Sequence, residues 1–225
     1  MAGAGRVMTG KVAVITGAAE GIGAGLVAGY RGRGWSVLAS ATILRPPNDP
    51  EVLAVEGDIA DPAGAGRVID AALARFGRLD TLVNNAGMVI SKPFTDYTTA
   101  DYAHVVGVSL TGFFWITQRA IAAMTTRYGG HVVNVSAAVA GSAGSGTPGV
   151  LTALTEGGLA TATRSLAVEY ASFGVRVNAI SLGILGTQAQ VNDIVDGVLF
   201  LESSPYITGE ILHIAGAPKN LTASR

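Results

Sequence analysis

Short β-branched runs alternate with longer amphipathic segments along this chain of 225 residues. The β-branched and apolar runs predict seven strands, at residues 11–16, 36–40, 51–55, 81–84, 131–135, 175–180 and 211–214. Segments of helical length lie between most of them, at residues 22–33, 62–76, 99–126, 150–170 and 192–201. This alternation predicts an α/β fold in which a doubly wound, seven-stranded parallel sheet has helices on both faces.

The connection between the second and third predicted strands differs from the others. Residues 41–50 contain three prolines, and proline removes a backbone donor and is excluded from helix interiors. We therefore expect an extended loop there, with little or no helix. The chain is long enough for one substantial core. We expect a single domain at residues 11–216, with a flexible N-terminal tail at residues 1–10 and a C-terminal tail at residues 217–225.

Composition supports a buried sheet and narrows the class of partner. The hydrophobic share of 49% and the charged share of 14% suit strands that are covered on both faces. A net charge of -1 without a basic cluster argues against nucleic acid and anionic membranes, so we expect a small-molecule ligand. The chain has no cysteine, no histidine pair at ligand spacing and no start typical of a signal peptide. We therefore expect no metal site and a cytoplasmic protein.

A glycine-rich segment follows the first predicted strand directly. Residues 16–23 have the sequence TGAAEGIG, with the spacing T-G-x-x-x-G-x-G. Gly17, Gly21 and Gly23 permit a tight turn, close approach of the backbone to a diphosphate, and close packing of helix against strand. The helix N-terminus supplies amide donors. The segment predicts a dinucleotide site at this turn, and a plain structural turn is the alternative.

Further motifs indicate a family. N-N-A-G follows the fourth strand at residues 84–87, RSLA spans residues 164–167, GVRVNAI spans residues 174–180, and ITG spans residues 207–209. Together with the glycine-rich turn, these motifs resemble the short-chain dehydrogenases/reductases over almost the whole chain. The resemblance implies a single Rossmann-like domain of oxidoreductase ancestry that binds NAD(P). The residues that it assigns to the cofactor are Gly17, Glu20, Gly21, Ile22, Gly23, Asp58, Asn85, Ala86, Gly87 and Thr187.

The resemblance leaves the choice of cofactor open. At the end of the second strand the family places an acidic residue for a free ribose 2′-hydroxyl, and basic residues for a 2′-phosphate. This chain has Ser40, Ala41 and Thr42 there. Glu20 would repel a 2′-phosphate if it faced the ribose. NAD is slightly favoured over NADP, and a protein with no bound dinucleotide is the alternative.

Other residue types occupy the catalytic tyrosine and lysine positions of the family. Counting back from RSLA places the family's Y-x-x-x-K motif on Thr152 and Glu156. No shift of the alignment restores the motif, because residues 129–169 contain no tyrosine and residues 93–218 contain no lysine. A tyrosine needs a nearby cation to transfer protons at neutral pH, whereas a carboxylate raises the pKa of a neighbouring acid.

Two further catalytic positions also differ from the family. Ser109 stands where the family has the asparagine of V-N-L-x-G, and Ala137 stands where it has the catalytic serine of N-I-S-S. Ser136 comes one residue early, and alternation along a strand turns its side chain to the opposite face. Hydroxyls in the following loop are further candidates, with an ordinary loop role as the alternative. They belong to Ser142, Ser145 and Thr147.

Glu156 is the best remaining candidate for a catalytic group. A carboxyl in a partly buried cleft can acquire a raised pKa and act as a general acid or base. The alternative role is a helix carboxylate that bonds a loop or a ribose hydroxyl. The mobile lid of the family is also missing, because only residues 188–192 separate Thr187 from the next predicted helix. A site without a lid excludes water poorly.

We therefore interpret the chain as a family homologue with a degenerate active site. The favoured hypothesis is a non-catalytic subunit, or a ligand- or nucleotide-binding partner, of an active dehydrogenase. One alternative is an enzyme with non-standard chemistry, such as non-redox proton transfer, elimination or cyclisation. A more distant one is NAD(P)-dependent oxidoreduction of carbonyls or alcohols. Small residues such as Gly157 and Gly158 match the family's four-helix interface, so we expect a homodimer, a homotetramer or a hetero-oligomer with an active subunit.

Overall fold

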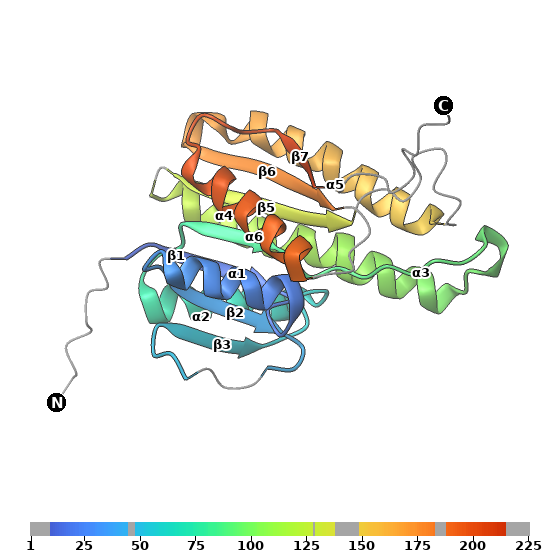
Figure 1. Cartoon of the computed structure of the whole chain (residues 1–225), viewed down its shortest axis with the longest axis horizontal. Coiled ribbons are helices and arrows are strands. Elements are labelled where there is room, and N and C mark those ends of the chain that lie inside the picture. Colours follow the sequence, from blue (N-terminus) through green and yellow to red (C-terminus); the bar gives the residue numbers. More distant parts are fainter. Residues whose placement is uncertain (1–9, 45–47, 128, 138–148, 183–187, 215–225) are drawn as a thin grey trace, which may run out of the picture.

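Seven parallel strands form one sheet in the order β3-β2-β1-β4-β5-β6-β7 (Figure 1). The computed structural model describes residues 10–44, 48–127, 129–137, 149–182 and 188–214. The chain winds outward from β1 in both directions, so the predicted fold class is confirmed, and each predicted strand is confirmed to within two residues. The strands are β1 (Val12–Thr16), β2 (Ser36–Ala41), β3 (Val52–Glu56), β4 (Thr81–Asn84), β5 (Gly130–Ala137), β6 (Val175–Leu182) and β7 (Ile211–Ile214).

The helices follow the predicted pattern, except at the start of the last one. That helix begins at Gln188, so the prediction of a start at residue 192 was wrong. The polar residues at 188 and 190 hide the apolar periodicity that marks the rest of the helix. The helices are α1 (Gly21–Gly32), α2 (Pro62–Phe76), α3 (Thr99–Val106), α4 (Phe113–Thr125), α5 (Val150–Glu169) and α6 (Gln188–Ser203), with short turns η1 (Phe94–Asp96), η2 (Gly107–Gly112) and η3 (Ala171–Phe173).

Helices cover the sheet on both faces and enclose two apolar layers. α1 and α6 lie on one face, and α2, α4 and α5 lie on the other (Figure 1). Successive residues of β1 alternate between these layers: Val12 and Val14 pack toward α2 and α4, while Ala13 and Ile15 pack toward α1 and α6. All four are fully buried, as expected for a strand covered on both sides.

The predicted loop between β2 and β3 is confirmed for the residues that the structure describes. Residues 42–44 and 48–51 contain no helix. The backbone N–H of Leu44 donates to the Glu56 carboxylate at 3.0 Å, which fastens the start of the loop to the end of β3. Most of the two predicted tails lies outside the described residues, as do Thr187 and the loop hydroxyls at residues 142, 145 and 147.

α3, η2 and α4 form one helical run, Thr99–Thr125, with a π-helical segment at η2. Among the described helices, this run alone is long and apolar enough to cross a membrane, with a mean hydropathy of 1.3. Core helices of water-soluble domains have the same properties. Ile116, Ala120 and Met124 on α4 are fully buried against the rest of this domain. Length and composition alone therefore do not indicate a membrane span here.

Candidate functional site

The glycine-rich turn joins β1 to α1 at the carboxyl edge of the sheet. Gly17 and Gly21 have φ of 62° and 53°, in the left-handed region that favours glycine. A Cβ on Gly23 would lie 2.0 Å from the carbonyl oxygen of Gly17, so only glycine lets the helix approach the turn this closely. Backbone N–H groups in the first turn of α1 are the donors that a diphosphate requires. The turn therefore fits the diphosphate of a dinucleotide.

Replacing Gly23 with alanine is expected to lower the free energy of unfolding by about 1–3 kcal/mol, because the new methyl group overlaps backbone atoms. Gly32→Ala on the same helix is the control, since a methyl group added there would meet no atom outside its own helical turn within 4 Å. That variant should be neutral or gain up to about 1 kcal/mol from helix propensity. Urea denaturation of both proteins measures the difference, and equal stabilities would contradict the steric argument.

The asparagine turn after β4 holds the glycine-rich turn in place. The side-chain amide of Asn85 donates to the carbonyl oxygens of Thr16 and Gly17, both at 3.1 Å. The backbone N–H groups of Asn85 and Ala86 both donate to the Thr16 hydroxyl at 3.0 Å. These bonds join the ends of β1 and β4. Asn85 and Ala86 thus have a structural role beside the predicted cofactor site, and Gly87 lies exposed next to them.

A ladder of buried side chains continues from this turn across the sheet. The Asn84 amide donates to the Thr117 hydroxyl at 2.8 Å and to the Asn134 side-chain oxygen at 2.9 Å. Asn134 in turn donates to the hydroxyl of Thr163 at 2.9 Å. The side-chain oxygen of Asn84 is buried and accepts no hydrogen bond within the described part of the chain. The sequence did not predict this ladder, because neither asparagine reveals its partners on α4 and α5.

A largely apolar cavity of about 150 Å³ opens between the asparagine turn and α5. Glu156 is the only residue with an ionisable side chain among the described residues that line it. The polar lining is completed by amide and hydroxyl groups. The lining residues are Ile22, Ile59, Asn84, Asn85, Ala86, Gly87, Met88, Val89, Ser109, Phe113, Asn134, Val135, Ser136, Glu156, Leu159 and Leu182.

Glu156 is buried, with 8% of its surface exposed. Burial raises the pKa of its carboxyl group to about 7, and a hydrogen bond from Ser136 offsets part of that effect. The Oε2 atom has no hydrogen-bond partner among the described residues. Ser136, which was not expected to replace the catalytic serine, lines the same cavity as Glu156. The side chain of Ser136 lies on the face of β5 that α5 and Glu156 cover.

The other predicted site residues lie in different surroundings. Ser109 is buried in the π-helical segment, lines the cavity, and accepts a long hydrogen bond of 3.4 Å from the backbone N–H of Met88. Thr152 is buried one turn before Glu156, and its hydroxyl has no partner among the described residues. Ala137 ends β5. A predicted cofactor residue, Thr187, lies outside the described residues.

The two predicted acidic cofactor residues are both exposed. Glu20 is the N-cap of α1, without a capping hydrogen bond from its side chain. Asp58 accepts a hydrogen bond of 2.9 Å from the backbone N–H of Ala60, which fixes the turn after β3. Over the described ranges, no group of three or more His, Asp or Glu side chains is arranged to hold a metal ion.

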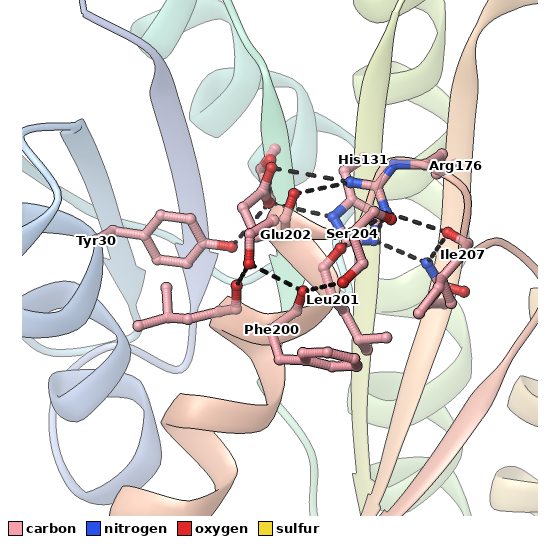
Figure 2. Close-up of polar contacts among 12 residues, drawn as sticks. Tyr30, His131, Arg176, Phe200, Leu201, Glu202, Ser204 and Ile207 are labelled. Carbon is pink, nitrogen blue, oxygen red and sulfur yellow. Dashed lines mark hydrogen bonds and ion pairs between the residues drawn. The ribbon is translucent and has the colours of Figure 1, made fainter.

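A second polar cluster lies at the opposite, amino end of the sheet (Figure 2). Glu202, at the end of α6, is its centre. Its Oε2 atom accepts hydrogen bonds from the Tyr30 hydroxyl at 3.1 Å and from the Thr81 hydroxyl at 2.7 Å. Its Oε1 atom lies 4.0 Å from the guanidinium of Arg176. Burial alone would raise the pKa of Glu202, but His131, Thr81 and Arg176 together hold it below its usual value.

His131 in this cluster is neutral. Its Nε2 atom faces two donors, the side-chain amide of Asn178 at 3.1 Å and the guanidinium of Arg176 at 3.4 Å, so it must accept. The proton is therefore on Nδ1, which donates to Glu202 at 3.1 Å. Burial lowers the pKa of His131 and favours the same neutral form. The cluster joins α1, α6 and three strands, which is a structural role.

The fold, the glycine-rich turn and the asparagine turn together define a class of nucleotide-binding oxidoreductases. Residues 11–194 match the family model of the short chain dehydrogenases, and the chain belongs to this family. Family membership is therefore confirmed, and members of this family typically bind NAD(P).

Known relatives cover nearly the whole chain. The 1,6-dihydroxycyclohexa-2,4-diene-1-carboxylate dehydrogenase of Acinetobacter baylyi is 30% identical, over 92% of this chain and 95% of that protein. The 3-oxoacyl-[acyl-carrier-protein] reductase FabG of Escherichia coli is 29% identical, over 92% of this chain and 96% of that protein. Among solved structures, a putative short-chain dehydrogenase/reductase from Burkholderia xenovorans has a TM-score of 0.84 at 27% identity, over 95% of this chain and 97% of that one.

Proposed function

We propose that this protein binds a small molecule or a nucleotide without the tyrosine-dependent hydride transfer of its family, as a non-catalytic subunit or binding partner of an active dehydrogenase. The observation that carries the proposal is Glu156. A buried carboxyl with a pKa near 7 occupies the position that the resemblance gives to a lysine. No cation lies among the described residues that line the cavity.

The chemistry of the family depends on the two positions that have changed. A tyrosine hydroxyl exchanges a proton with the substrate oxygen only if a cation lowers its pKa toward neutral. Thr152 has an aliphatic hydroxyl, and a carboxyl at residue 156 raises the pKa of any neighbouring acid once it ionises. Neither group supplies the proton of carbonyl reduction by the family route.

The two halves of a dinucleotide would meet different surroundings. The diphosphate would bind at the turn formed by Gly17, Gly21 and Gly23, whose backbone geometry fits it. The nicotinamide half of NAD(P) would supply a hydride donor or acceptor beside the cavity, where no described lining residue carries a cation. We favour NAD over NADP, because residues 40–42 at the end of β2 include no basic side chain and Glu20 is exposed near the turn.

The exposed surface of α5 and α4 supports the role of a partner subunit. The outer face of α5 has exposed small and apolar residues, including Gly157, Gly158 and Val168, and Phe114 of α4 is 53% exposed. Small side chains let helices of two subunits approach closely, and exposed apolar side chains on the same helices favour burial there. We propose a homodimer, a homotetramer or a hetero-oligomer with an active family member.

Native mass spectrometry of the untagged protein from its own host tests the proposal. We expect a retained nucleotide or small molecule, a second subunit, or both, and no turnover of NAD(P)H by the purified chain alone. Mixing the chain with the captured subunit should restore or raise dehydrogenase activity. Substrate-dependent oxidation of NAD(P)H by this chain alone would overturn the proposal in favour of ordinary oxidoreduction.

A second candidate function is non-redox proton transfer, such as elimination or cyclisation. The observation that favours it is the pair of Ser136 and Glu156, since a carboxyl with a pKa of about 7 is well matched to acid or base work at neutral pH. This function predicts that the pure protein turns over its substrate. The variant Glu156→Gln should abolish that turnover while its circular dichroism spectrum stays unchanged.

A further inference from the structure

The cavity contains an acid without a counter-charge. Among the described lining residues there is no Lys, Arg or His to pair with Glu156. In sequence, the segments that follow β5 and β6, at residues 138–148 and 183–187, also contain none of these residue types. An ionised carboxylate buried in apolar surroundings is costly unless a cation accompanies it. Within the described cavity the carboxyl can stay protonated, or it can ionise beside a cation that a ligand brings in.

Unused hydrogen-bond acceptors accompany this acid. Glu156 Oε2 has no partner among the described residues, and neither has the side-chain oxygen of Asn84 in the same cavity wall. Buried polar atoms are almost always hydrogen-bonded in folded proteins, so such a pair calls for a ligand or water that donates. The Asn84 amide nitrogen is committed to Thr117 and Asn134, which fixes its oxygen as the free atom. The site thus presents acceptors, one of them a potential anion.

The other residues that line the cavity limit the size and polarity of the ligand. Apolar side chains, among them Ile59, Phe113 and Leu159, form most of the wall. The volume of about 150 Å³ is that of a cavity able to hold benzene. An aromatic ring such as that of Phe113 also attracts a cation that lies over its face.

We propose that this cavity binds a small primary amine, with its ammonium group on Glu156 and the oxygen of Asn84 and with a compact apolar body against the aliphatic and aromatic wall. The inference rests on the proposed function, in that it names the class of ligand for the same cavity. An ammonium group has donors for both free oxygens and supplies the charge that the chain lacks. A neutral alcohol of the same size would satisfy one acceptor and leave the carboxylate uncompensated.

Calorimetric titration with benzylamine and with benzyl alcohol tests this inference. At pH 8 the wild-type protein should bind the amine at least tenfold more tightly than the alcohol. The preference should weaken toward pH 6, because the carboxyl takes up a proton while the amine stays charged. In Glu156→Gln the two probes should bind equally. Glu169→Gln removes the same charge from an exposed position on the same helix, and it should keep the preference.

Three results with the wild type and Glu156→Gln would overturn the amine site. They are equal binding of both probes by the wild type, a preference for the amine that survives Glu156→Gln, and no binding of benzylamine at millimolar concentration. A preference lost equally in Glu169→Gln would also count against it, since bulk charge would then explain the binding. The proposed function fails separately, through turnover of NAD(P)H by the chain alone, so the two failures are distinguishable.

Discussion

Replacing Glu202 with alanine is expected to lower the free energy of unfolding by about 3–5 kcal/mol, the usual cost of removing one partner of a buried ion pair. The carboxylate accepts from Tyr30, Thr81 and His131, and it balances the charge of Arg176. Its removal leaves these donors buried without an acceptor. Urea denaturation followed by circular dichroism measures the loss.

The matched control for this prediction is Glu210→Ala. Glu210 is exposed, and the hydrogen bond that it makes to Asn178 comes from its backbone N–H and survives the substitution. We expect a change within about 0.5 kcal/mol for the control. A loss below about 1 kcal/mol for Glu202→Ala would show that the cluster contributes little to stability.

Replacing Glu156 with glutamine is expected to stabilise the protein at pH 8 by roughly 3 kcal/mol and to flatten its stability between pH 5 and 8. The pKa of Glu156 is about 7 in the folded chain, against an ordinary value of 4.5. The folded state therefore holds the proton more tightly than the unfolded state does. The contribution of Glu156 to the free energy of unfolding is therefore full below the ordinary pKa of 4.5. It falls as the pH rises from there to about 7, and it is constant above that.

The amide of glutamine cannot ionise, so the variant avoids the cost of a buried carboxylate at high pH. At pH 4 the two proteins should have nearly equal stability, because the carboxyl is then neutral in both states. Thermal unfolding between pH 4 and 9 compares them, with Glu169→Gln as the exposed control. Parallel curves for the wild type and Glu156→Gln would contradict a raised pKa.

The central strands could be predicted from the sequence because a strand covered on both faces has a continuous apolar run, as in β1, which is buried along its whole length. The edge strands β3 and β7 are only partly buried, and their β-branched and apolar residues marked them. The boundary of α6 could not be predicted, because its first turn lacks apolar periodicity. The glycine-rich turn was also predictable, since its backbone angles and close contacts admit only glycine at Gly17 and Gly23. These steric requirements involve residues close together in the sequence, so the glycine spacing alone predicts the turn.

The contents of the cavity depend on contacts between distant residues. The contact of Ser136 with Glu156 could not be predicted, because alternation says which face of a strand a side chain takes and only packing says what covers that face. The bonds of Asn134 to Asn84 and Thr163 likewise join strands and helices far apart in the chain. Glu202 gave no signal in the sequence, because a glutamate at a helix end is usually exposed.

The two polar clusters lie at opposite ends of β5, one at His131 and the other at Ser136. Five residues of extended strand separate their backbones by about 16 Å. Substitutions this far apart, without shared partners, have additive effects on stability. The chemistry at the carboxyl edge can therefore change by mutation while the amino edge keeps the domain folded. A scaffold built in this way can accept new side chains around the cavity without losing its fold.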